Sequence, residues 1–195
     1  MTHRVLVFVL LSACLPGTRA VDSKAPPVDT GGPLDDGLDA IDPATLPAGD
    51  RPCADPVLVT IDEVIDGDTA YISMPNGAWD KLRLIGVDTP EIAHADDEVA
   101  DCYGDEAFTF TRGLLPVGSR VWLTFDGECR DVYDRLLAYA HKGTAEQLFV
   151  QRRLLHDGWA RTLTIPPNDS LAATFAADAD DARSRGAGLW GACGG

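Results

Sequence analysis

Two short acidic segments contain the side chains best suited to hold a cation. Asp66 and Asp68 are separated by one glycine, and Asp88 and Glu91 are separated by a Thr-Pro pair. Carboxylates that converge at a turn are the ligands that a hard cation such as Ca²⁺ prefers. An Asp-Gly pair is also common in ordinary turns, and a proline simply ends many strands, so each segment alone is weak evidence.

Two arginines stand next to apolar segments. Arg83 lies on an otherwise apolar strand, five residues before Asp88, where it could also point to solvent. Arg135 follows Tyr133 and directly precedes a second apolar strand. Taken together, the acidic segments and the two arginines indicate a functional site more strongly than any one of them.

The elements that must position these residues follow an α+β order. Alternating apolar residues and turn signals predict strands, and apolar residues at helical spacing predict helices. Five short strands with a helix after the third fit a small barrel of OB type. The expected strands are Val57–Ile65, Thr69–Met74, Lys81–Val87, Arg120–Phe125 and Leu136–His141, and the expected helices are Tyr103–Leu115, Glu146–Asp157 and one from a cap at Asn168 or Asp169 to about Arg185.

The chain resembles the staphylococcal nuclease (thermonuclease) family. Matching segments occur in order over essentially the whole region from Cys53 to Cys193, so the resemblance is not a matter of chance. It implies a five-stranded OB-fold β-barrel with three helices and calcium-dependent hydrolysis of DNA and RNA phosphodiesters. The matching segments are Val64–Thr69, Arg83–Glu91, Tyr103–Ala107, Arg130–Tyr139, Gly158–Arg161 and Gly188–Trp190.

The resemblance also implies a role for each matching residue. Glu91 would position or deprotonate the attacking water, and the arginine forks would donate to phosphate oxygens in planar pairs that lysine cannot form. Ca²⁺ would polarise the phosphate. The implied catalytic residues are Arg83, Glu91 and Arg135; the implied calcium ligands are Asp68, Asp88 and the carbonyl of Thr89; Tyr133 would touch a nucleotide phosphate.

Three features depart from the family pattern. Asp134 replaces a glycine and could pair with Arg135 or stiffen its loop, while Thr164 and Pro166 stand where the type member has base-flanking tyrosines. The formal net charge is −15 at pH 7, which argues against binding nucleic acid through bulk charge. We therefore expect weak substrate binding. The active-site loop is acidic at Asp96, Asp97, Glu98 and Asp101, and we interpret Arg152, Arg153 and Arg161 as helix-surface residues.

The first 20 residues have the pattern of a signal peptide. A basic start precedes the apolar run Val5–Leu11, and Leu11–Cys14 resembles the lipobox of bacterial lipoproteins, in which Cys14 is lipidated. Cleavage after Ala20 and plain secretion is the alternative. We expect an exported protein, either a lipoprotein of the cell envelope or a secreted one, with the Pro-, Gly- and Asp-rich residues 15–52 as a disordered linker and residues 53–195 as the domain.

The four remaining cysteines fit an exported chain, because an even number outside the cytoplasm usually means disulfide bonds. Three connectivities are possible. In the fold that the resemblance implies, the loops of Cys102 and Cys129 border the same cleft, which leaves the two ends to pair. We therefore predict Cys102–Cys129 and Cys53–Cys193.

Two functions remain for the chain. The first is an exported calcium-dependent nuclease with a DNA or RNA substrate, acting as a monomer, with a possible lipid anchor. The second is a non-catalytic OB-fold domain that binds a ligand or a protein at the cell surface. Loss of Arg83, Glu91 or Arg135 would favour the second, and all three are present.

Overall fold

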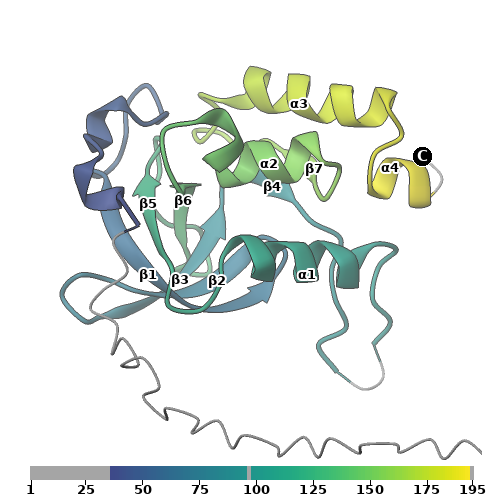
Figure 1. The fold of residues 1–195 in the computed structure, drawn as a ribbon, viewed down its shortest axis with the longest axis horizontal. Coiled ribbons are helices and arrows are strands. Elements are labelled where there is room, and N and C mark those ends of the chain that lie inside the picture. The colour runs from purple at the N-terminus through teal and green to yellow at the C-terminus, as the bar shows by residue number, and fades with distance from the viewer. Residues whose placement is uncertain (1–35, 96–97, 194–195) are drawn as a thin grey trace, which may run out of the picture. The chain divides into compact units, whose positions relative to one another are not determined.

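The computed structural model describes residues 36–95 and 98–193 and contains a closed five-stranded barrel (Figure 1). The strands follow one another around the barrel in the order β1-β2-β3-β6-β5. This confirms the expected OB-type architecture. The barrel strands are β1 (Val57–Asp66), β2 (Thr69–Ser73), β3 (Trp79–Leu84), β5 (Arg120–Thr124) and β6 (Leu136–His141).

Side chains alternate between the inside and the outside of the barrel, as the period of two along a strand requires. The inward-facing set includes Ile61, Ile72, Leu82 and Leu123, all with an exposed fraction of 0%. Strand β3 pairs antiparallel with β2 and parallel with β6, so Leu82 lies opposite Leu136 on the inner face. Trp79, Lys81 and Arg83, which alternate with the buried leucines of β3, therefore face outward.

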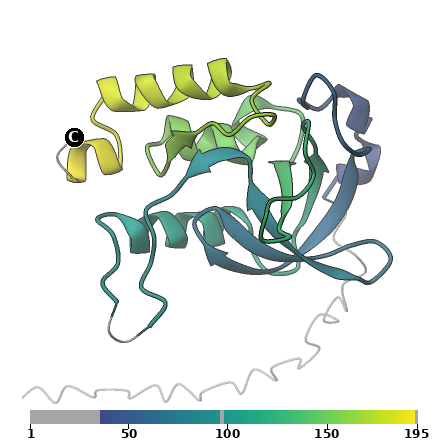
Figure 2. The same cartoon turned by 180° about the vertical axis from the view of Figure 1, so that it is seen from behind.

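Within the described residues, three substantial helices accompany the barrel, and a short fourth helix follows the third. Both views place α2 and α3 together above the barrel and α1 against its side (Figures 1 and 2). No helix within the described ranges is both long and apolar enough to cross a membrane. The helices are α1 (Gly104–Leu114), α2 (Val150–His156), α3 (Ala172–Ser184) and α4 (Leu189–Ala192).

The expected third strand, Lys81–Val87, is broken at Ile85. Strand β3 ends at Leu84, and β4 (Gly86–Asp88) leaves the barrel to pair with β7 (Arg161–Leu163). Gly86 makes this bend possible, because its φ of 81° is in the left-handed region and a β-carbon would collide with Phe175. The bend carries Asp88 to the edge of a second, two-stranded sheet.

The helix boundaries also differ from the prediction. Glu146–Leu148 forms a separate 3-10 turn before α2, and α3 begins only at Ala172. Asn168 does not cap α3, because its side chain exchanges two hydrogen bonds with the backbone of Glu128, at 2.8 and 2.9 Å. Tertiary partners therefore override the local capping preference of this residue.

Residues 36–52 are ordered on the barrel, which corrects the linker prediction for this part. Two 3-10 turns, Leu38–Ala40 and Pro43–Thr45, lie beside β5. Leu38 and Leu46 are 3% and 5% exposed, and Arg120 pairs with Asp36 and Asp39. The rest of the predicted linker, the signal peptide and Cys14 lie outside the described residues.

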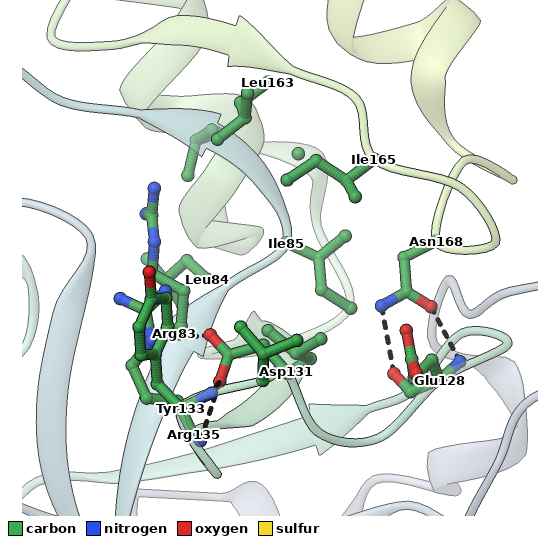
Figure 3. A pocket seen from close by; sticks show the side chains of 14 residues that line it. Arg83, Leu84, Ile85, Glu128, Asp131, Tyr133, Arg135, Leu163, Ile165 and Asn168 are labelled. Carbon is green, nitrogen blue, oxygen red and sulfur yellow. Dashed lines mark hydrogen bonds and ion pairs between the residues drawn. The ribbon is translucent and has the colours of Figure 1, made fainter.

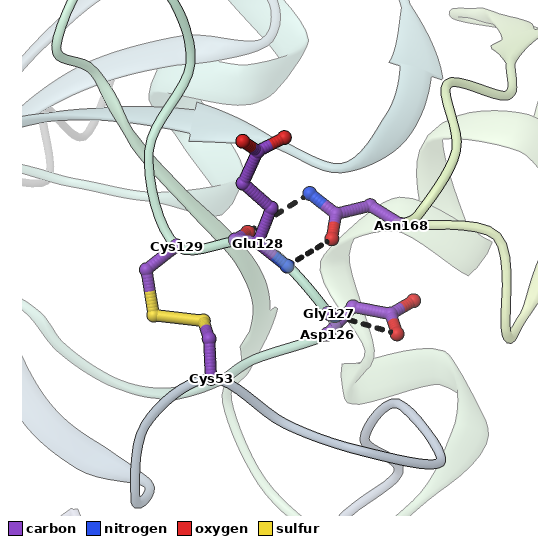
Figure 4. The surroundings of a disulfide bond; sticks show 6 residues. All are labelled: Cys53, Asp126, Gly127, Glu128, Cys129 and Asn168. Atoms are coloured by element: carbon purple, nitrogen blue, oxygen red, sulfur yellow. Dashed lines mark hydrogen bonds between the residues drawn. A yellow bond between two sulfur atoms is a disulfide. The ribbon is translucent and has the colours of Figure 1, made fainter.

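Both predicted disulfide pairings are wrong. The bonds are Cys53–Cys129, which Figure 4 shows, and Cys102–Cys193. Their Cα separations are 5.7 and 5.8 Å. The chain before β1 runs along the β5 end of the barrel, where the N–H of Cys53 donates to the carbonyl of Asp126. The two ends of the domain are therefore each fastened to a different loop and not to each other.

We expect Leu46→Ala to lower the free energy of unfolding by about 2–3 kcal/mol, because it empties a buried site between the N-terminal segment and the barrel. Denaturant unfolding measures this effect. Val117→Ala is the control, since Val117 is 72% exposed in the connection between α1 and β5. Equal stability of the two variants would show that residues 36–52 do not pack as described.

Candidate functional site

The turn between β1 and β2 holds the first carboxylates in a buried position. Asp68 is 3% exposed, and its two carboxylate oxygens accept hydrogen bonds from the Thr69 hydroxyl and from the N–H of Thr89. The hydroxyl of Thr111 on α1 donates to the Gly67 carbonyl at 2.8 Å. A β-carbon at Gly67 would collide with Thr89, so glycine is required where these two segments meet.

Arg83 joins the two acidic segments. Its guanidinium forms an ion pair with Asp68 and a second one, at 3.1 Å, with Asp88. Burial raises the pKa of Asp68, and the charge of Arg83 opposes that shift. Two carboxylates thus converge on one cationic group near the surface, with the Asp88 side chain 50% exposed.

The carboxylate of Glu91 lies in a separate cluster with Asp66 and His94. The ligand atoms of the three side chains lie within 4.8 Å of one another. A hydrogen bond with the Asp66 carboxyl, together with partial burial, raises the pKa of Glu91 to about 7. Glu91 can therefore take up and release a proton near neutral pH, as a general base must.

The backbone of Glu91 is fixed by the far end of its own loop. The N–H of Asp101 donates to the Glu91 carbonyl at 2.9 Å, and the Asp101 carboxylate accepts from the N–H of Glu91. Gly104, the first residue of α1, packs so closely on this carbonyl that a side chain would not fit. Cys102, the residue after Asp101, is bonded to Cys193. The described parts of the loop between these anchors, residues 92–95 and 98–100, project away from the barrel (Figure 1).

Arg135 is oriented by Asp131. The carboxylate of Asp131 accepts from the backbone N–H of Arg135 at 3.0 Å and from its Nε at 2.7 Å. The guanidinium lies over the ring of Tyr133, 5.5 Å from its centre. Burial alone would raise the pKa of Asp131, but the hydrogen bonds from Arg135 and the N–H of Tyr133 lower it overall.

Asp134 does not pair with Arg135. Its carboxylate faces Arg130 at 3.5 Å, and its φ is 61°, in the left-handed region that glycine adopts without strain. Aspartate is one of the few other residues that tolerate this conformation, which explains how it can replace the family's glycine. The replacement of glycine by Asp134 therefore keeps the backbone conformation of the loop and leaves the charge of Arg135 unpaired with Asp134.

A pocket of about 290 Å³ brings both arginines together (Figure 3). Arg83, Tyr133 and Arg135 line one part of it, and the apolar side chains of Ile85, Leu163 and Ile165 line another. Thr164 and Pro166 are not among its lining residues, so aliphatic neighbours occupy the wall instead of stacking rings. The pocket is thus a charged surface next to an apolar one, suited to a phosphate joined to a flat organic group.

Two important residues were not predicted from the sequence. His94 joins Asp66 and Glu91, and Asp131 orients Arg135. Both residues are close in sequence to a predicted site residue, which could have indicated their roles: His94 follows Glu91 by three residues, and Asp131 precedes Arg135 by four. Of the predicted set, Arg83, Asp68 and Asp88 are in contact, and Thr89 bonds Asp68. Glu91 is not among the residues that line the pocket, although the charge of Arg83 acts on its carboxyl group and opposes the rise in its pKa.

The donor set around Arg83 fits a hard cation. Asp68 and Asp88 direct carboxylate oxygens at one positive group, and the backbone of Thr89 is held against Asp68. Oxygen ligands of this kind suit Ca²⁺ or Mg²⁺. The cluster of Asp66, Glu91 and His94 is a second group of potential ligands, close to the first because Asp66 and Asp68 share one turn.

The described residues thus form a closed OB-type barrel with two arginines in one pocket and carboxylates close to one of them. The family model "Staphylococcal nuclease homologue" matches residues 81–192. The chain belongs to the staphylococcal nuclease family.

Curated relatives of this chain are named as nucleases. The chain is 36% identical to a thermonuclease of Staphylococcus intermedius over 130 residues, which are 67% of this chain and 74% of the relative. It is 37% identical to Endonuclease YncB of Bacillus subtilis over 136 residues, which are 69% of this chain and 62% of that relative. The SPbeta prophage-derived endonuclease YokF of the same organism is 35% identical over 134 residues, 68% of this chain and 43% of the relative.

We expect Asp131→Asn to slow the hydrolysis of denatured DNA by about 10- to 100-fold, because Arg135 loses its orientation. Asparagine can keep the oxygen that accepts the backbone N–H groups only by turning its amide nitrogen toward the Arg135 side chain. Asp134→Asn is the matched control, since Asp134 lies on the same loop, faces Arg130 and tolerates asparagine at positive φ. A rate in Asp131→Asn equal to that of the control would contradict this role of Asp131.

Proposed function

We propose that the chain is a calcium-dependent nuclease that hydrolyses phosphodiester bonds of DNA or RNA. The observation that carries the proposal is the placement of Arg83 and Arg135 in one pocket, with the carboxyl group of Glu91 near enough to Arg83 for its charge to oppose the rise in the pKa of Glu91. The membership in a family of nucleases supports the same reaction. A non-catalytic binding domain would have no need for two arginines in one pocket or for a glutamate with a pKa near 7.

The chain's own residues can assist the attack of water on the phosphorus; as the new P–O bond forms, the bond to the leaving oxygen breaks, and that oxygen takes its proton from solvent. Glu91, with a pKa of about 7, accepts a proton from the attacking water. Arg83 and Arg135 donate hydrogen bonds to phosphate oxygens as negative charge builds on them, and the guanidinium of Arg135 is already held by Asp131. The apolar wall holds the sugar and base of the substrate so that the phosphate meets the two arginines.

Calcium is the cation that we propose for the site. Asp68 and Asp88 would hold it with the carbonyl of Thr89, and when bound it would polarise the phosphate. The support is the convergence of two carboxylates on a position next to the pocket and the all-oxygen character of the donors.

The test is hydrolysis of denatured DNA and of RNA by the purified protein, with calcium and with a calcium chelator. We expect cleavage with calcium only, and a fall of about 10²–10⁴-fold in Glu91→Gln. Glu106→Gln, an exposed glutamate on α1, is the matched control. Arg83→Ala is less useful, because it leaves the buried carboxylate of Asp68 without its partner and can unfold the protein.

Full activity in the presence of the chelator would contradict the calcium requirement. A rate in Glu91→Gln equal to that of Glu106→Gln would contradict the assignment of the base. Absence of cleavage of either nucleic acid under all conditions would contradict the nuclease function itself.

We propose further that the protein is exported and attached to the cell envelope through lipid on Cys14, with plain secretion as the alternative. The support is the lipobox-like Leu11–Cys14 after an apolar run and the two disulfide bonds of the described domain. The lipid anchor and the monomeric state remain parts of the proposal.

In a bacterial expression host we expect metabolic labelling of the protein with a fatty acid and its recovery with membranes. Cys14→Ala should abolish the label and release the protein from membranes. Retention of the unprocessed chain in the cytoplasm would contradict export. Release of an unlabelled chain that begins after Ala20 would favour secretion over lipidation.

A further inference from the structure

Three residues of β3 share the outer face of the barrel. Trp79, Lys81 and Arg83 alternate with Leu82 and Leu84, which are buried in the core. Because successive side chains of a strand point to opposite faces, the first three form one row that ends at the proposed active site.

The beginning of this row is an exposed aromatic group. Trp79 is 72% exposed, the largest aromatic side chain among the exposed hydrophobic residues that the structure describes. Its ring packs edge-on against Tyr71 of β2, with ring centres 5.8 Å apart and an angle of 79° between the planes. Tyr71 thus supports one edge of the indole and leaves a face of it open to solvent.

The middle of the row is an unpaired cation. The ammonium of Lys81 has no ion pair or hydrogen bond to any residue within 36–95 or 98–193, although the chain carries a net charge of −15. The nearest acidic residue in sequence, Asp80, is already paired with Arg130 at 2.6 Å. A free positive charge on an acidic protein attracts an anion such as a phosphate.

The row is continuous with the pocket. Leu82 lies opposite Leu136, the first residue of β6, and Arg135 directly precedes that strand just as Lys81 directly precedes Leu82. Arg83 and Leu137, which are paired on the outer face, both line the pocket. At about 3.3 Å per residue, Trp79 is roughly 13 Å from Arg83 along the strand. This length corresponds to at most about four nucleotides of a stacked strand.

Resting on the nuclease function proposed above, we infer that the outer face of β3 binds the part of a single-stranded nucleic acid next to the cleavage site. A base stacks on Trp79, and Lys81 contacts a phosphate between this base and the two arginines. Single strands fit this surface because their bases are free to stack on an aromatic ring. Stacking does not depend on charge, and it therefore suits an acidic protein that cannot attract nucleic acid through bulk charge.

The test compares a fluorescent single-stranded DNA of ten nucleotides with a dinucleotide that cannot reach Trp79 from the pocket. Binding is measured by fluorescence anisotropy with the full chain carrying Glu91→Gln, which slows hydrolysis during the measurement. Trp79→Ala, Lys81→Gln and the control Val117→Ala are added to this background; Val117 has the same exposed fraction as Trp79, in the connection between α1 and β5. Cleavage of both substrates by the chain with Glu91 intact is measured in parallel.

We expect Trp79→Ala to weaken binding of the longer strand about tenfold or more and to leave binding of the dinucleotide unchanged. Lys81→Gln should lower the slope of log affinity against log salt by about 0.7, the value for one phosphate contact on a single strand. Trp79→Ala should leave this slope unchanged. If either residue had only a structural role, its substitution would not give these two different results, a loss of affinity limited to the longer strand for Trp79→Ala and a lower salt dependence for Lys81→Gln.

Equal affinity of Trp79→Ala and Val117→Ala for the longer strand would overturn the inference, while cleavage by the chain with Glu91 intact would still support the nuclease function. An equal loss of affinity for both substrates in Trp79→Ala would also overturn it, because the effect would then lie in the pocket. Failure of the unsubstituted chain to bind or cleave either substrate would overturn the nuclease function and the inference together.

Discussion

The buried carboxylate of Asp126 holds together the segments on which the pocket depends. It is 1% exposed and accepts hydrogen bonds from the N–H of Gly127, the N–H and hydroxyl of Ser170, and the hydroxyl of Tyr139, at 2.7–3.1 Å. No ion pair among the described residues involves it. A buried charge without a cation is tolerated only when its lone pairs are satisfied, so these segments must keep their relative positions.

The two walls of the pocket follow from this arrangement. The chain after Gly127 leads through Glu128 to the loop of Arg135, and the chain before Ser170 contains Ile165 and Asn168. The paired hydrogen bonds between Asn168 and Glu128 fix the second contact between the walls (Figures 3 and 4). Because Arg135 is already held by Asp131, substrate binding does not need to order its side chain, which lowers the entropic cost of binding.

The sequence predicts those parts of the molecule that depend on local pattern. Alternation along β1, β2 and β5 follows from burial on one face, and each motif that carries the resemblance is one continuous segment of the chain. It does not predict the break at Ile85, which depends on the distant ring of Phe175 above Gly86, nor the role of Asn168, which depends on Glu128. The disulfide pairing failed for the same reason: residues 36–52 look like a polar linker, yet their few apolar side chains dock on the barrel and carry Cys53 to Cys129.

The two disulfide bonds interleave along the chain, because Cys102 lies between Cys53 and Cys129 while its partner Cys193 follows both. A single cut of the backbone anywhere between Cys53 and Cys193 therefore separates the two members of at least one bond, and the resulting pieces remain covalently joined. A protease that nicks the projecting loop before Cys102 would produce a two-chain molecule of unchanged mass, apart from one added water. Separation of the fragments would require a reductant as well as a protease.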